Sequence, residues 1–374
     1  MMAFQKIVVV LNFTLCFVAR WYKVVAHRLD TKYILTILLI TYHSSLIIAQ
    51  DIHFSQINAT PLFINPAATG SMGQDYRASL HYKNQWQSVS QAYKTMGLGF
   101  DCKLLKKGRD KKNNLGAGFT VFSDKAGVTN FNTLQAQALV AYNLQVTRAQ
   151  RLAMGANVGF IQQSINIANL KWDNQFDGNA YDASRETGEN SVFTKTLALD
   201  LGAGLLWKLQ PKHSPITVEA GAAIAHISGT KNSFYKKNYK TPLKYSFHLS
   251  SQIKVGSLSL SISPQVLIAL QKPYQETVLG AQFKYIIGQD SRDGFLNTYS
   301  LTSSALGIGV YYRLKDAVIA MASYDYKKTF SINFSYDMNV SQLKSASKNR
   351  GGMEISLTYK GFYQKTGLGK IPVD

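Results

Sequence analysis

Cysteine, acidic residues and long apolar runs are all scarce in this chain of 374 residues. The two cysteines exclude a disulfide-stapled scaffold and a zinc site built from cysteines. Beyond residue 49, no stretch reaches the roughly 18 apolar residues of a membrane-spanning helix, which excludes a helical membrane protein. Lys and Arg number 41 against 21 Asp and Glu, so the net charge of +20 reflects a shortage of acids. Such a composition does not predict a lysine-rich nucleic-acid-binding protein.

The motifs of common catalytic and metal sites are also missing from the sequence. Its seven histidines are scattered without paired ligand spacing, and it has no phosphate-binding loop, nucleophile elbow or zinc-protease helix. Serine and histidine do fall on polar strand faces, as a barrel phospholipase would need, but they are also the usual lining of a wet lumen. We therefore predict no enzymatic activity, no metal site and no cofactor.

Residues 1–49 have the features of a targeting segment. Lys32 precedes an apolar stretch at 33–40, and the segment ends on the small residue Ala49, which is the order of a secretory signal peptide. An earlier apolar run at 7–19 leaves two explanations open: translation starts nearer Lys32, or the signal has a long amino-terminal region or acts as an anchor. Cleavage after Ala49 would leave Gln50 as the first residue. Because it removes five basic residues and one acidic residue, the mature charge would be +16.

From residue 75 onward, apolar and polar residues alternate with the period of two that is typical of strands. In 330–340, for example, every second residue from Phe330 to Val340 is apolar and the intervening residues are Ser, Asn or Asp. Fourteen segments have this pattern: 75–86, 92–103, 114–123, 132–142, 150–164, 194–210, 216–226, 241–255, 257–270, 275–287, 304–314, 316–326, 329–340 and 351–361.

The length and number of these segments favour an all-β, transmembrane antiparallel barrel of about 14 strands. Most segments have 10 to 15 residues, which exceeds the roughly 5–6 of a soluble strand and suits the roughly 9–11 of a tilted membrane strand. An even number returns both ends of a closed barrel to one side, and aromatic residues cluster near the strand ends. The alternative is a soluble β-protein. The barrel would occupy 75–361, followed by a tail at 362–374.

If both ends of the mature chain lie in the periplasm, the connections can be assigned to sides. The long connection at 165–193 then lies outside the cell, whereas 288–303 makes an unusually long periplasmic turn, so a strand there could be miscounted. A basic periplasmic turn could face acidic partners, lipid headgroups or cell-wall polymer. Its cations are Lys103, Lys106, Lys107, Arg109, Lys111 and Lys112.

Four Gly-x-Gly pairs fall on the inward faces of the predicted strands. In barrels, glycine commonly serves to curve strands. The functional alternative is that bare strips leave room in the lumen for a segment or a ligand. These pairs are Gly97 and Gly99, Gly116 and Gly118, Gly202 and Gly204, and Gly307 and Gly309.

Residues 50–74 are turn-rich, lack strand alternation and could be a flexible lead-in. They also contain two blocks of a family motif, with further blocks at 312–317, 335–343 and 351–357. The residues of the amino-terminal blocks are Gln50, Asp51, Phe54, Ser55, Gln56, Asn65, Pro66 and Gly70, followed by Asn84, Gln85 and Trp86. Together these blocks resemble the PorP/SprF proteins of the type IX secretion and gliding system of Bacteroidetes, and the resemblance covers essentially all of 50–361.

The resemblance implies a non-enzymatic integral outer-membrane protein that serves secretion or surface attachment of type IX cargo, including large adhesins. Its implied partners are periplasmic components of the secretion or peptidoglycan-tethering machinery and the cargo itself, beside membrane lipid and lipopolysaccharide. The amino-terminal motif is expected to anchor residues 50–74 at the periplasmic end of the barrel or inside its lumen. The main alternative function is a porin or a small-ligand transporter.

Overall fold

The computed structural model describes most of the chain beyond residue 50. Its described residues are 51–85, 92–107, 113–127, 131–166, 171–188, 194–212, 214–229, 240–255, 259–288, 291–293, 298–300, 303–341 and 347–363.

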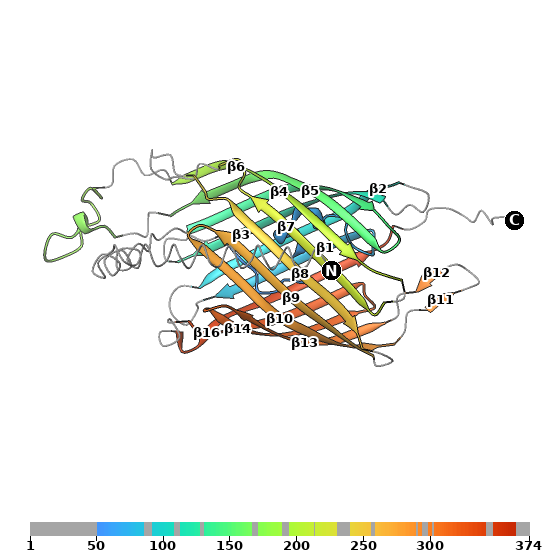
Figure 1. Cartoon of the computed structure of the whole chain (residues 1–374). Helices are drawn as coiled ribbons and strands as arrows, with labels where there is room; N and C mark the ends of the chain where they lie inside the picture. Colours follow the sequence, from blue (N-terminus) through green and yellow to red (C-terminus); the bar gives the residue numbers. More distant parts are fainter. Residues whose placement is uncertain are drawn as a thin grey trace, which may run out of the picture. The chain divides into compact units, whose positions relative to one another are not determined.

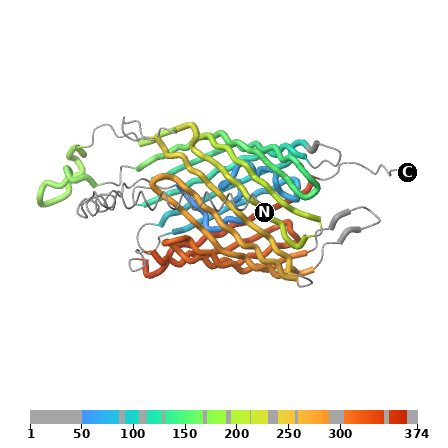
Figure 2. Tube along the Cα trace, viewed as in Figure 1, coloured from blue at the N-terminus to red at the C-terminus, as the bar shows by residue number. Residues whose placement is uncertain are grey.

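Fourteen antiparallel strands close into a barrel (Figures 1 and 2). Each barrel strand pairs with the next barrel strand along the sequence, and β1 pairs with β16 to complete the closure. The strands are β1 (Tyr76–Gln85), β2 (Tyr93–Lys107), β3 (Asn113–Ala126), β4 (Phe131–Gln145), β5 (Gln150–Ser164), β6 (Lys195–Leu209), β7 (Ile216–Ala225), β8 (Lys244–Lys254), β9 (Leu260–Gln271), β10 (Tyr274–Ile287), β13 (Ser304–Arg313), β14 (Ala317–Tyr326), β15 (Phe330–Asn339) and β16 (Arg350–Gly361).

The fold predicted from the alternation pattern is confirmed. Each predicted segment is a barrel strand, with ends that differ from the prediction by at most four residues. The suspected extra strand near 288–303 is not part of the barrel wall. Two short strands occur there instead, β11 (Ser291–Asp293) and β12 (Thr298–Ser300), and they pair only with each other.

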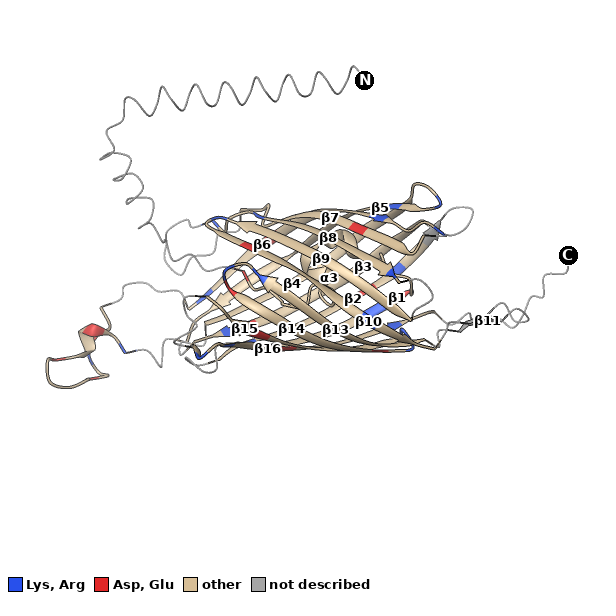
Figure 3. Cartoon of the chain, turned by 60° about the horizontal axis from the view of Figure 1, so that its bottom comes forward, with Lys and Arg blue, Asp and Glu red and all other residues tan. Residues whose placement is uncertain are grey.

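The two faces of the wall differ as a membrane requires. In β15, Ile332 and Phe334 are 39% and 45% exposed, whereas their neighbours Asn333 and Ser335 are buried. Charged residues colour only short pieces of the strands in Figure 3. Because hydrocarbon offers no hydrogen-bond partners, the apolar side chains face outward and the polar side chains face the lumen.

The connections divide the barrel into two ends. Tyr76 pairs with Gly361, so the start of β1 and the end of β16 lie at one end, here called the carboxyl-terminal end. The turn at 327–329 lies there, whereas the long connection between β5 and β6 lies at the opposite end, here called the loop end. Outer-membrane barrels generally have short periplasmic turns and longer outer loops; if this chain follows that rule, the carboxyl-terminal end faces the periplasm.

Among the described residues, no helix is long and apolar enough to cross a membrane.

The lumen holds the segment that precedes the first strand. This lumenal segment, residues 51–75, contains the short helix α3 (Pro61–Ile64) and the 3-10 turn η1 (Pro66–Ala68), and Figure 3 shows α3 within the barrel. Proline begins both elements, where the missing N–H does not interrupt a hydrogen bond. Ile57 and Ile64 pack on an apolar cluster of the wall, formed by Leu267, Val278, Tyr311, Ile319 and Met321.

The outward face generates a stability prediction. Replacing Phe334, near the middle of β15, by lysine places a charge in hydrocarbon and is expected to lower the free energy of unfolding by about 2–4 kcal/mol. Urea unfolding in phospholipid vesicles measures this change. Phe334→Leu, which keeps the position apolar, is the control, and equal stability of the two variants would contradict an outward membrane face.

Candidate functional site

The lumenal segment runs the whole length of the barrel. Asp51 contacts His226, Lys244 and Gln271 at the loop end. At the carboxyl-terminal end, the Gln74 amide donates to the carbonyl of Lys328 at 3.1 Å, and the Asp75 amide donates to the carbonyl of Gly361 at 2.8 Å. The assumption that both ends of the mature chain lie on one side is therefore wrong for Asp51, because the segment crosses the lumen before β1 begins.

Ser55 and Gln56 are held by β15 and β16. The Ser55 amide donates to Glu354 Oε2 at 2.7 Å, and the Ser55 hydroxyl donates to Asp337 Oδ2 at 2.8 Å. Gln56 Nε2 donates to Ser335 Oγ at 3.1 Å, and its Oε1 accepts from Ser356 Oγ at 2.6 Å. Since both residues are fully buried, these bonds replace those that water would otherwise supply.

A network of buried charges surrounds this contact. Arg313, at the end of β13, forms ion pairs with Asp337, with Asp316 at 2.8 Å and with Glu276 at 3.9 Å. On the other side, Lys83 Nζ donates to the backbone carbonyl of His53 at 2.8 Å. Removing one partner would leave a charge buried without compensation, which costs about 3–5 kcal/mol. The network therefore ties the lumenal segment to a rigid part of the wall.

Asn65 connects the segment to the opposite side of the barrel. Its Nδ2 donates to the carbonyl of Leu205 at 2.9 Å and lies 3.1 Å from His248 Nε2. Its Oδ1 accepts from the Ala67 amide at 2.9 Å and so caps η1. A Cβ atom at Gly204 would overlap Asn65 Oδ1, so this strand position has to be glycine for the segment to approach.

Thr69 and Gly70 fix the segment where it turns toward β1. Asn143 Nδ2 donates to the Thr69 carbonyl at 3.0 Å, and the Gly70 amide donates to Asp101 Oδ2 at 2.8 Å. Asp101 is fully buried and also pairs with Arg77 at 2.8 Å. Gly70 has a φ of +68°, which favours glycine, and a Cβ atom there would lie 2.8 Å from Gly116 Cα.

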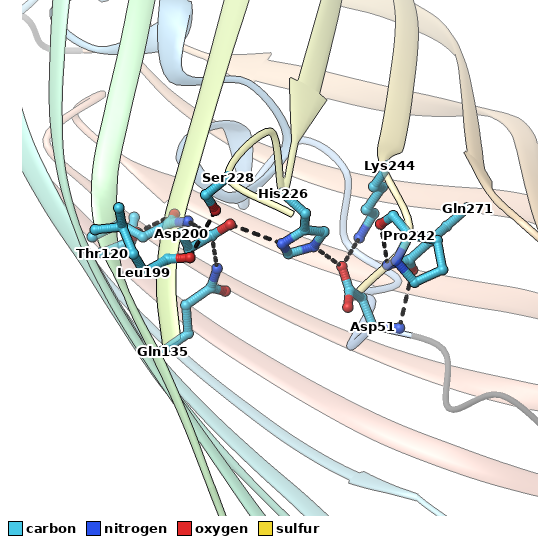
Figure 4. A network of polar contacts seen from close by, with 11 residues as sticks. Asp51, Thr120, Gln135, Leu199, Asp200, His226, Ser228, Pro242, Lys244 and Gln271 are labelled. Carbon is cyan, nitrogen blue, oxygen red and sulfur yellow. Dashed lines mark hydrogen bonds and ion pairs between the residues drawn. The ribbon is translucent and has the colours of Figure 1, made fainter. Parts of the chain in front are cut away.

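A histidine holds the amino-terminal end of the segment (Figure 4). His226, the residue after β7, lies between two carboxylates, with Nε2 2.7 Å from Asp51 Oδ2 and Nδ1 2.8 Å from Asp200 Oδ1. Asp200 also accepts from Gln135 and Gln137, each at 2.6 Å. The arrangement joins the lumenal segment to the barrel through an ionisable side chain.

The carboxylates keep His226 protonated at neutral pH. Burial disfavours its charged form, but the hydrogen bonds with Asp200 and Asp51 outweigh this effect and raise the pKa of His226 from 6.5 to about 9. Burial likewise opposes the charge of Asp51, but Lys244 and His226 hold the pKa of that carboxyl well below its usual range. His226, Asp51 and Asp200 thus form an ion-paired contact between the lumenal segment and the barrel, here called the latch.

The same geometry bears on catalysis. Both ring nitrogens of His226 are engaged by carboxylates, so the ring has no free nitrogen to take a proton from the nearby Ser228, whose hydroxyl donates to the Leu199 carbonyl at 2.7 Å. Within the described ranges, no group of three or more His, Cys, Asp or Glu side chains is placed to hold a metal ion.

The structure places most residues of the predicted amino-terminal motif against the wall. Those in contact with it include Asp51, Phe54, Ser55, Gln56, Asn65, Pro66 and Gly70. Asn84 is buried and Gln85 is half-buried at the end of β1, opposite Met353 and Gly352 of β16. Gln50 and Trp86 lie outside the described residues.

The predicted glycine strips divide into two groups. Gly97, Gly99, Gly116 and Gly204 abut the lumenal segment. For example, the rings of Phe54 and Phe63 lie next to Gly97, with their centroids 5.3 Å apart and their planes tilted by 54°. Gly118, Gly202, Gly307 and Gly309 have groups of the wall as their nearest neighbours.

The predicted basic turn is shorter than expected. Lys103 belongs to β2, is buried, and has its Nζ 3.5 Å from the Gly73 carbonyl, because its position in the alternation points it into the lumen. Lys106 and Lys107 end the same strand. Arg109, Lys111 and Lys112 lie outside the described residues.

Two residues that hold the segment, His226 and Asp200, were not singled out from the sequence. Arg313, Asp337 and Glu354 lie in the carboxyl-terminal blocks of the family resemblance, but no role in holding the segment was predicted for them. The available signal was their charge, since an ionisable residue on a membrane strand faces the interior and has a partner there. The alternation pattern does not identify the partner, because the contacting residues are far apart in the sequence: Asp51 and His226 are separated by 175 positions, and Ser55 and Glu354 by 299.

Comparisons with known proteins give one family match. The model of a family described as type IX secretion system membrane protein PorP/SprF matches residues 47–359. No curated protein matches the chain.

Solved barrels resemble the fold at low identity. The toluene transporter TodX of Pseudomonas putida is 13% identical, over 83% of this chain and 93% of that one, with a TM-score of 0.41. A FadL homologue of Pseudomonas aeruginosa is 8% identical, over 81% of this chain and 94% of that one, with a TM-score of 0.45.

The latch predicts a measurable titration. His226 is expected to titrate at about pH 9, and Asp51→Asn should lower its pKa by removing one carboxylate. Nuclear magnetic resonance of the labelled imidazole in micelles measures both, with the exposed Asp182→Asn as control. A pKa of His226 near 6.5 in the unaltered protein would refute the latch.

The sign of the pH dependence follows from the raised pKa. The stabilisation by His226, on the order of 3 kcal/mol for a shift of this size, is complete below about pH 6.5 and is lost as the pH rises through about 9. The contribution of Asp51 is present above its ordinary pKa of 3.8 and is lost at lower pH.

The close approach at Gly204 predicts a packing effect. Gly204→Ala should push Asn65 away from its carbonyl partners and lower the free energy of unfolding by about 1–3 kcal/mol. The urea midpoint measures the loss. Gly73→Ala is the matched control, because an added Cβ there meets no atom within 4 Å. Equal urea midpoints for Gly204→Ala and Gly73→Ala would show that the segment does not need glycine at position 204.

Proposed function

Because this chain belongs to the PorP/SprF family of type IX secretion system membrane proteins, we propose that it supports type IX secretion, anchors secreted cargo such as gliding adhesins at the cell surface, or does both. It is an outer-membrane β-barrel, as family and fold together indicate. Its role is non-enzymatic in this proposal. Export through a Sec signal peptide, with Gln50 as the mature amino terminus, is part of the same proposal.

The occupied lumen is the observation that supports an anchor over a conduit. The lumenal segment bonds to strands around the barrel, among them β2, β6, β15 and β16. Two cavities of about 80 and 250 Å³ lie beside it. In this proposal, a barrel whose lumen holds a bonded segment interacts with its partners through its ends.

The two ends suit different partners. The loop end faces outward if the short turns are periplasmic, and there the connection between β5 and β6 presents the exposed aromatic rings of Phe176 and Tyr181. Exposed aromatic side chains are common contact points in protein interfaces. Cargo is therefore proposed to bind at the loop end, and periplasmic secretion or peptidoglycan-tethering components at the carboxyl-terminal end. Lipid and lipopolysaccharide surround the wall.

Purification from the native outer membrane in mild detergent, followed by identification of co-purifying proteins, tests the proposal. A secretion-system component or a secreted adhesin is expected to accompany the barrel. A variant in which Phe176 and Tyr181 are both replaced by serine should lose cargo while keeping periplasmic partners. Recovery of the barrel alone would overturn the proposed function.

Electrical measurements separate an anchor from a porin or transporter. The purified protein is expected to give no stable large openings in planar bilayers, whereas a variant lacking residues 51–74 should conduct. A variant that lacks only 177–184, in the connection between β5 and β6, is the control and should stay closed. Stable openings of the unaltered protein would support the porin alternative.

A further inference from the structure

A second, basic cavity lies at the carboxyl-terminal end of the lumen. Its volume is about 250 Å³, and it is bounded by the lumenal segment on one side and by β1, β10, β14, β15 and β16 on the other. The charged residues that line it are Arg77, Lys284, Asp325, Lys328 and Lys360. Lys328 lies in the turn at 327–329, so the cavity reaches the barrel end.

Cations exceed acids in this cavity. Lys284 pairs with Asp325 at 2.6 Å, and Arg77 pairs with Asp101 behind the cavity wall at 2.8 Å. Lys360, by contrast, forms no ion pair within the part of the chain that the structure describes. Arg77, Lys284 and Lys360 therefore face the two carboxylates of Asp101 and Asp325, which leaves one cation in excess for an incoming anion.

Neutral hydrogen-bonding groups complete the lining. Asn58 and Gln282, which bond to each other at 3.1 Å, lie beside Ser331, Asn333 and Thr358. Amides and hydroxyls can donate to oxyanions, and a charge-assisted hydrogen bond is about twice as strong as a neutral one. The cavity thus combines one cation in excess of its carboxylates with hydrogen-bond donors on several sides.

We propose that this cavity binds the carboxylates of an acidic peptide segment that enters from the carboxyl-terminal end of the barrel. Lipid headgroups are a poor fit, because they surround the apolar outer face of the wall, whereas Lys360 and Lys284 are on its inward face. The volume suits one or two acidic side chains and is too small for a folded domain. The site lies apart from the latch at the loop end.

Fluorescence anisotropy with the purified full-length barrel in nanodiscs tests this site. The probe is a labelled peptide of glutamate and glycine, compared with the same peptide carrying glutamine. The glutamate peptide is expected to bind saturably, and Lys360→Gln should weaken it by about tenfold, whereas Lys360→Arg should retain it. Lys212→Gln is the control, since Lys212 is exposed in a turn at the same barrel end. Heat-modifiable electrophoretic mobility shows that each variant is folded.

Two results would overturn the proposal: equal binding of the two peptides, or an unchanged affinity in Lys360→Gln. Binding of inorganic phosphate at the site, with no binding of the glutamate peptide, would overturn it as well. The assay uses purified protein, so its failure would leave the role in secretion untouched. Conversely, loss of co-purifying cargo would not affect peptide binding.

Discussion

A strand in hydrocarbon has to hydrogen-bond along both edges, and this constraint shapes the whole molecule. It forces the wall to close between β1 and β16 and to turn its apolar side chains outward. The polar side chains must then meet inside, where buried groups need partners of their own. The segment before the first strand supplies many of these partners, so that the barrel and its filling form one hydrogen-bonded structure.

Ionic contacts and close backbone approaches hold this filling in different ways. The charges around Arg313 and the latch at His226 fix the segment by groups that would be costly to leave unpaired. Glycine at positions such as 204 removes side-chain volume where the segment touches the wall. The ionic contacts and the close approaches at glycine each fix one part of the segment in one position. Together they hold the segment in one register along the entire lumen.

A filled lumen changes which parts of the barrel are available for function. Partners can reach the loops, the turns and the basic cavity between the segment and β16. Since the segment begins at the loop end and finishes at Asp75, it also connects the two ends physically. The proposed anchoring role uses the two ends of the barrel and needs no passage through the lumen.

The sequence by itself determined the barrel, because the period-two alternation of segments such as 330–340 is a local property that the membrane enforces. It also marked Ser55, Gln56 and Asn65 as unusual, through their resemblance to a family motif. Only the tertiary structure decided that these residues fill the lumen, that Asp51 lies at the end opposite Gly361, and that Lys103 points inward. The reason is physical: contacts such as Ser55 with Glu354 join residues 299 positions apart, and no local pattern encodes such a pairing.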